Sequence, residues 1–258
     1  MWSFLYGHHH GKVEIILDNA PARSAELLAQ NRVDAALVPV IAYQTIENVR
    51  LIPDVCVGAR ERVRSVCLIT DGRELSDVKT VSLDVSSKTS VVLTKIIFRE
   101  FLGFEPEWRH VEPDLDIMLS NADCALLIGD PALSVADCGL RIADSNPRPK
   151  IQNLKSFDLA ELWHQHTGFG FVFAMWMTRH YSCEIDFSTA RDEGLAHIDG
   201  IAANYASDIG LSLDEMRSYL TENISYSIEG SMQKGMELYF DLAAKNRLIE
   251  ENRSLIYC

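Results

Sequence analysis

Four hydroxyl side chains gather in one short turn of the sequence, and this pattern is typical of a site for a negatively charged group. The turn follows a β-type run at residues 80–85 and leads into an apolar helix that we expect to end at Gly103; it holds Ser86, Ser87, Thr89 and Ser90. The start of a helix exposes unpaired N–H groups and a partial positive charge, which suit a carboxylate or a phosphate. The alternative interpretation is an ordinary N-cap, in which a serine or threonine satisfies those donors without any ligand.

A second candidate lies at the end of a predicted strand. Gly129 and Asp130 directly follow the apolar run at 124–128. Ligands in open α/β sheets gather at the carboxyl ends of strands, so we expect Asp130 to face a binding site. Gly-Asp-Pro is also a common turn, and this purely structural interpretation stays open.

The elements that would position these residues form two α/β blocks. Residues 12–17 and 33–40 are predicted strands joined by a helix ending near Leu28, which predicts a βαβ unit, a parallel sheet and right-handed crossovers. Two connections between the blocks, near 70–80 and 168–178, predict two lobes with a double-stranded hinge and a ligand cleft. We assign residues 1–72 with 172–258 to lobe 1 and 73–171 to lobe 2. The remainder predicts three amphipathic helices, at 187–206, 212–226 and 231–249.

Composition excludes several classes of protein. The 258 residues carry a formal net charge of −13, which argues against a nucleic-acid surface. The longest apolar run, 169–177, is too short to span a bilayer, and no signal segment opens the chain, so we expect no membrane partner. Six cysteines without CxxC spacing favour a reducing, cytoplasmic location. Three adjacent histidines at 8–10 have no Cys or acidic partner at ligand spacing, so we predict no metal site.

Several of these segments, taken in order, resemble the chorismate dehydratases of the futalosine route to menaquinone. The similarity covers nearly the whole chain and rests on six motifs: DAALVPV at 34–40, VRSV at 63–66, SSKTS at 86–90, PDL at 113–115, LIGDPAL at 127–133 and TGFGFVFAMW at 167–176. The resemblance implies an α/β, two-lobed type II periplasmic-binding-protein-like fold, here with a C-terminal helical segment. It also implies a hydro-lyase that removes water from chorismate to give 3-[(1-carboxyvinyl)oxy]benzoate without any cofactor.

The resemblance also assigns roles to residues. It places the catalytic serine of the hinge strand at Ser65, for which the structural alternative is a strand hydroxyl bonded to backbone. It places substrate binding at two turns, whose residues are Ser86, Ser87, Thr89, Ser90, Gly129 and Asp130. Chorismate carries two carboxylates, and the helix start at 87–90 would bind one of them. Loss of the hydroxyl makes the ring aromatic, so the protein mainly has to orient the substrate and exclude water.

Two other functions are compatible with the same pattern. One is a non-catalytic protein that binds small carboxylates on the same fold, because fold alone does not separate binding from catalysis. The other is the related 1,4-dihydroxy-6-naphthoate synthase, against which the SSKTS and IGDPA motifs argue. Family members begin with a strand ending in Tyr-Leu-Asn, whereas this sequence starts at Met1-Trp2, after that point. That asparagine belongs to the family's active site, so three interpretations stay open: a misassigned start codon, a fragment of a longer chain, or a protein that lacks the asparagine.

Overall fold

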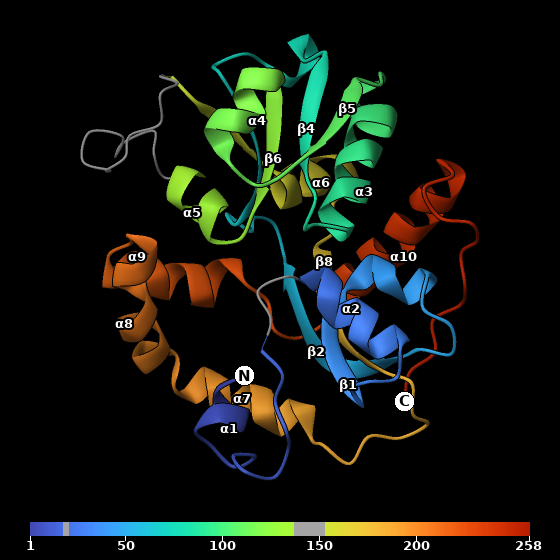
Figure 1. Cartoon of the computed structure of the whole chain (residues 1–258), viewed down its shortest axis with the longest axis vertical. Coiled ribbons are helices and arrows are strands. Elements are labelled where there is room, and N and C mark those ends of the chain that lie inside the picture. The colour runs from blue at the N-terminus through green and yellow to red at the C-terminus, as the bar shows by residue number, and fades with distance from the viewer. Residues whose placement is uncertain (18–20, 137–152) are drawn as a thin grey trace.

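Two β-sheets, each covered by helices, make up the computed structural model, which describes residues 1–17, 21–136 and 153–258 (Figure 1). A three-stranded sheet forms lobe 1 and a five-stranded sheet forms lobe 2. The strands are β1 (Ala35–Pro39), β2 (Arg50–Ala59), β3 (Val66–Thr70), β4 (Thr80–Asp84), β5 (Glu107–Val111), β6 (Cys124–Ile128), β7 (Lys155–Asp158) and β8 (Phe171–Thr178).

Helices cover both sheets and make up most of the chain after β8. The α-helices are α1 (Trp2–Leu5), α2 (Pro21–Ala29), α3 (Thr89–Ile96), α4 (Leu115–Asn121), α5 (Asp130–Ala136), α6 (Leu159–Thr167), α7 (Phe187–Ala196), α8 (Ile198–Ile209), α9 (Leu213–Ser218) and α10 (Gly230–Lys245). Short 3-10 and π-helical turns are η1 (Val40–Gln44), η2 (Leu75–Asp77), η3 (Ile97–Leu102) and η4 (Tyr219–Asn223). No helix in these described ranges is long and apolar enough to cross a membrane.

The sheet of lobe 1 is antiparallel, so the parallel βαβ unit predicted for this part is wrong. Its strand order is β1-β8-β2, and β8 runs antiparallel to both neighbours. Residues 12–17 form no strand. Val13 and Ile15 instead pack against a small cluster around Phe4 and Phe187, while Ile16 and Leu17 are exposed. The apolar residues Val13 and Ile15, for which we predicted a strand, therefore pack against side chains of helices α1 and α7 without pairing in a sheet.

The sheet of lobe 2 has the order β5-β4-β6-β3-β7. Strand β4 pairs in parallel with β5 and β6, whereas β3 pairs antiparallel with β6 and β7. Because β3 belongs to this sheet, the chain first crosses between the lobes after β2, ahead of the boundary predicted at residue 72. The return crossing lies between α6 and β8, close to the boundary predicted at residue 171.

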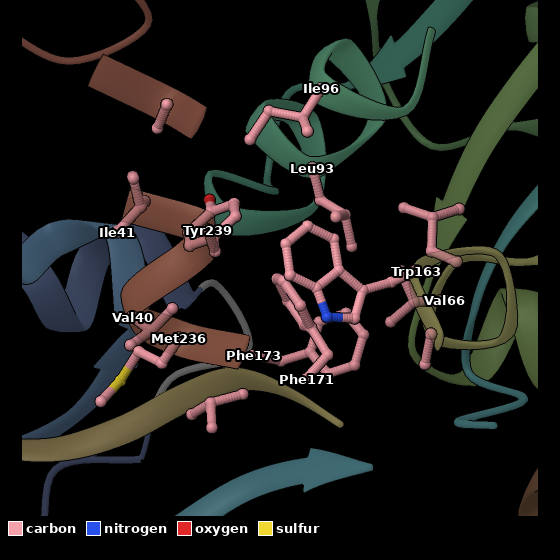
Figure 2. Packing of buried hydrophobic residues seen from close by; sticks show 14 of the residues in the cluster. Val40, Ile41, Val66, Leu93, Ile96, Trp163, Phe171, Phe173, Met236 and Tyr239 are labelled. Carbon is pink, nitrogen blue, oxygen red and sulfur yellow. The ribbon is translucent and has the colours of Figure 1, made fainter. Parts of the chain in front are cut away.

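One apolar core runs through both lobes and joins them. Figure 2 shows its centre, where Trp163 of α6 meets Phe171 of β8 and Leu93 of α3, beside Tyr239 of α10. The rings of Trp163 and Phe171 lie 5.4 Å apart in an edge-to-face arrangement, and each of these side chains is fully buried. Burying each such side chain stabilises the fold by about 2–3 kcal/mol, so the interface between the lobes is a packed core rather than a loose contact.

Three glycines allow the backbone segments at the return crossing to approach closely. A Cβ added at Gly235 of α10 would lie 2.0 Å from the carbonyl oxygen of Gly170. A Cβ at Gly170 would lie 2.9 Å from the carbonyl oxygen of Ala59, and one at Gly58 would lie 2.6 Å from that of Phe171. Helix α10 is thereby packed directly against the segment that connects the two lobes.

The helices after β8 follow the predicted pattern with two differences. The helix predicted at 212–226 is shorter, since α9 ends at Ser218, the π-helical turn η4 ends at Asn223, and Ser225 forms a β-bridge with Gly58. The predicted helix at 187–206 is two helices, α7 and α8, separated at His197, whose ring stacks on Trp2 with centroids 3.6 Å apart. The capping box at the start of α9 is confirmed, since Ser212 and Glu215 each accept a hydrogen bond from the other's backbone N–H.

Candidate functional site

The sequence candidates lie at one edge of the lobe 2 sheet. Strands β4 and β6 are parallel neighbours, so the turns that follow them, at 85–89 and 129–130, share that edge. Strand β3 is antiparallel to β6, with Val66 opposite Ile128, so Ser65 precedes β3 at the same edge. Three consecutive strands of the sheet thus bring Ser65, the hydroxyl-rich turn and Gly129–Asp130 to one line of loops.

Ser65 and Gly129 are joined directly. The N–H of Gly129 donates to the carbonyl oxygen of Ser65 over 2.7 Å. Gly129 has a φ of +68°, a conformation that glycine adopts without steric cost. Ser65 is buried, and its hydroxyl lies 3.5 Å from the carbonyl oxygen of Val63, which is at the limit of a hydrogen bond.

The loop before Ser65 is held by the buried carboxylate of Asp158. Oδ2 of Asp158 accepts the N–H groups of Val63 and Arg64 over 3.0 and 2.6 Å. Its Oδ1 caps α6 by accepting from Ala160 and Glu161 over 2.9 and 3.1 Å. Burial raises the pKa of Asp158, and these N–H groups oppose the rise.

Asp158 also stabilises an unusual backbone conformation. Arg64 has a φ of +63°, which a side-chain-bearing residue adopts only at a cost in free energy. Residues in such conformations cluster at functional sites, where the surrounding structure holds them in place. Here the holding group is Asp158, and the residue it positions lies next to Ser65.

Ser86 shapes the hydroxyl-rich turn from within. Its N–H and its hydroxyl both donate to Oδ1 of the buried Asp84, over 2.8 and 2.6 Å, and the N–H of Ser87 donates to the Asp84 carbonyl oxygen over 3.1 Å. A hydroxyl has one hydrogen to donate, and that of Ser86 is committed to Asp84. Ser87 is half-buried on the same turn.

Helix α3 begins at Thr89 without a side-chain cap. Its N-cap residue is Lys88, and no side chain there accepts a hydrogen bond from the first turn. The interpretation of this turn as an ordinary serine or threonine N-cap is therefore wrong. Uncapped N–H groups at a helix start leave donors available to an anion.

Thr89 connects this helix start to lobe 1. Its Oγ1 accepts the N–H of Ile41 over 3.3 Å, and its carbonyl oxygen accepts the hydroxyl of Tyr239 over 3.0 Å. Because the Thr89 hydroxyl accepts from Ile41, its own hydrogen stays available for an acceptor such as a carboxylate. Thr89 and Ser90 are both buried.

Ser65 also contacts Tyr219, a residue that the sequence did not single out. Burial raises the pKa of Tyr219, a hydrogen bond with Ser65 and the charge of Arg64 lower it, and the Asp130 carboxylate raises it. Tyr219 therefore lies among the side chains around Ser65. Asp130 itself is exposed at the start of α5.

Neither metal nor disulfide chemistry is built into the described residues. Across 1–17, 21–136 and 153–258, no three His, Cys, Asp or Glu side chains are grouped to hold a metal ion. Five cysteines in those ranges are free thiols, and Cys138 lies outside the described residues. Burial raises the pKa of the Cys56 and Cys67 thiols to about 12, which makes both unreactive.

The sequence is similar to a known protein family and to a protein of assigned function. A family model described as "Menaquinone biosynthesis" matches residues 2–245. A protein of Thermus thermophilus named chorismate dehydratase is 30% identical over 243 residues, covering 90% of this chain and 88% of that protein.

Two solved structures show the same fold at low identity. A protein of Archaeoglobus fulgidus aligns with a TM-score of 0.63 at 16% identity, covering 96% of this chain and 94% of that one. The periplasmic aliphatic sulphonate binding protein of Escherichia coli aligns with a TM-score of 0.57 at 13% identity, covering 90% and 77%. The predicted two-lobed, periplasmic-binding-protein-like fold is confirmed.

Proposed function

The chain belongs to the menaquinone biosynthesis family, as its sequence motifs predicted, and we propose that it dehydrates chorismate to 3-[(1-carboxyvinyl)oxy]benzoate. The observation that carries this proposal is the buried, uncapped start of α3 at the sheet edge that also bears Ser65. Its N–H groups and the Thr89 hydroxyl match one carboxylate of the substrate, with Ser90 and Ser87 beside it. Gly129 and Asp130 would line the same cleft beside this turn, at the same edge of the sheet.

The reaction requires little covalent chemistry from the protein. The C4–O bond breaks, the C3–H proton is removed, and both leave as one molecule of water while the ring becomes aromatic. We assign Ser65 the hydrogen bond to the departing hydroxyl group. The Asp84 carboxylate is engaged by Ser86, so we assign proton removal to the substrate's own enolpyruvyl carboxylate. In this scheme the enzyme is a cofactor-independent lyase that acts by orientation and exclusion of water.

Turnover of chorismate tests the proposal. Purified protein should consume chorismate and release the aromatic ether in equal amount, measured by chromatography with ultraviolet detection. Ser65→Ala should lower the rate about tenfold or more while leaving the folded state intact. If the wild-type protein binds chorismate but never converts it, the non-catalytic carboxylate-binding function is correct instead. If it does neither, this assignment of the cleft fails.

Thr89 provides a direct test of carboxylate binding. Thr89→Val keeps the shape of the side chain but removes its donor, so chorismate should bind about 10- to 100-fold more weakly, corresponding to loss of one hydrogen bond to a charged group. Thr89→Ser keeps the hydroxyl and should bind nearly as well as the wild type. Titration calorimetry measures both.

Ser86 supplies the matched control for that measurement. Because its hydroxyl hydrogen is committed to Asp84, Ser86→Ala should weaken binding less than Thr89→Val does. Equal affinity for chorismate in the Thr89→Val and wild-type proteins would show that the carboxylate is held elsewhere.

A further inference from the structure

A helical arm of lobe 1, residues 198–228, reaches the edge of lobe 2 that bears Ser65. Ser225 and Gly58 of β2 exchange backbone hydrogen bonds of 2.8 and 2.9 Å, and the N–H of Cys56 donates to the Tyr226 carbonyl oxygen over 3.1 Å. These bonds anchor the end of the arm to the lobe 1 sheet. In Figure 1 the arm, drawn in orange, lies beneath α5 of lobe 2. The arm therefore links the lobe 1 sheet to the loops around Ser65.

Tyr219 is held by contacts on both sides of this arm. It opens the π-helical turn η4, and its carbonyl oxygen accepts the N–H of Ile224 over 3.2 Å. Its ring packs both against the main core and against the small cluster under α8 and α9, formed by Ala202, Ala206, Leu211 and Met216. Short π-helical segments occur frequently at functional sites, where they redirect a side chain.

A side-chain hydrogen bond joins Tyr219 to Ser65. Ser65, Arg64 and Asp130 all act on its titration, and Tyr219 in turn raises the pKa of the neighbouring Tyr226. Since burial raises the pKa of Tyr219 above its ordinary value, the phenol is protonated at neutral pH and can donate a hydrogen bond. A second contact supports the same docking: the Asn223 side chain donates to the Arg62 carbonyl oxygen over 3.3 Å.

We propose that Tyr219 is a positioning residue, which donates to the Ser65 hydroxyl and leaves the Ser65 hydrogen free for the substrate. The long contact between Ser65 and Val63 leaves that hydrogen poorly fixed without a second partner. This inference rests on the proposed function for the identity of the reaction.

A double-mutant cycle tests whether Tyr219 acts through Ser65. Tyr219→Phe should lower kcat for chorismate about tenfold and change KM little, because the lost hydroxyl is needed in the reacting complex. In the Ser65→Ala background the same substitution should have no further effect on kcat. Tyr226→Phe, which removes a neighbouring hydroxyl, should leave kcat unchanged in both backgrounds. An equal loss in both backgrounds, or a lowered Tm with unchanged kcat, would overturn the proposal.

A measurement without chorismate separates this inference from the proposed function. In protein labelled with carbon-13 at the tyrosine ring carbon bearing the hydroxyl, Ser65→Ala should shift the Tyr219 signal, which Tyr219→Phe identifies. An unmoved signal means that the two hydroxyls do not interact and removes the proposed mechanism. A moved signal in a protein that leaves chorismate intact would refute the proposed reaction while preserving the contact.

Discussion

Replacing Asp158 with asparagine is expected to lower the free energy of unfolding by about 2–4 kcal/mol. The asparagine oxygen can still cap α6, but its NH₂ group would face the N–H groups of Val63 and Arg64, which now bond to Oδ2. Each buried donor left unpaired costs about 1–3 kcal/mol. Part of that cost is offset because the neutral asparagine, unlike the aspartate, does not bury a charge. Urea denaturation followed by circular dichroism measures the change.

The same substitution should also affect the site, because Arg64 would lose the group that holds its backbone beside Ser65. We expect activity to fall even under conditions where the protein stays folded. Asp114→Asn is the matched control: Asp114 caps the exposed start of α4 with a single bond to the Ile117 N–H, and asparagine caps helices equally well. If the two variants lose the same stability, Asp158 does no more than an ordinary helix cap.

Adding one methyl group at Gly235 is expected to cost about 3 kcal/mol or more of stability. The new Cβ would lie 2.0 Å from the Gly170 carbonyl oxygen, and backbone on both sides leaves no flexible side chain to move aside. Overfilling a packed interior typically costs about 1–3 kcal/mol, and this overlap is severe. Thermal unfolding of Gly235→Ala should show a clear drop in Tm.

The same substitution at Gly200 is expected to have the opposite effect on stability. Gly200 lies in helix α8, is exposed, and has nothing within 4 Å of an added Cβ. Gly200→Ala should therefore stabilise the protein by about 0.5–1 kcal/mol through reduced freedom of the unfolded chain. A Gly235→Ala protein as stable as the Gly200→Ala protein would mean that α10 does not press against the return crossing.

Local sequence pattern was sufficient for the parts of the fold that are built from neighbouring segments. The strands at β4 and β6, the turns after them, and the capping box at Ser212 follow from hydrophobic runs and turn residues. The antiparallel sheet of lobe 1 does not follow from local pattern. Its central strand β8 is separated from β1 and β2 in the sequence by all the strands of lobe 2, and no residue near β1 or β2 indicates this pairing. Residues 12–17 show the same limit, since alternating apolar residues also fit a segment packed on helices.

The residues of the candidate site likewise fall into those that the sequence predicted and those that it did not. Thr89 and Gly129 follow strands that the sequence marks, whereas Ser65, which precedes β3, was predicted only from the family resemblance. Asp158 contacts Arg64 across 94 positions of the chain. Tyr219 depends on a π-helical turn that has no residue signature. Residues such as Asp158 and Tyr219, which position other residues, can be identified only from the folded structure.

The insertion of β8 between β1 and β2 has a consequence for the order of folding during synthesis. Strands β3 to β6 of lobe 2 are complete once residue 128 has been made, and they pair among themselves. Strands β1 and β2 emerge earlier, yet both hydrogen-bond to β8 and must wait until residue 178. Because non-local pairing is slow and leaves strand edges open, lobe 2 should resist protease first on a nascent chain. Until β8 arrives, the early part of lobe 1 is the segment that a chaperone would have to protect.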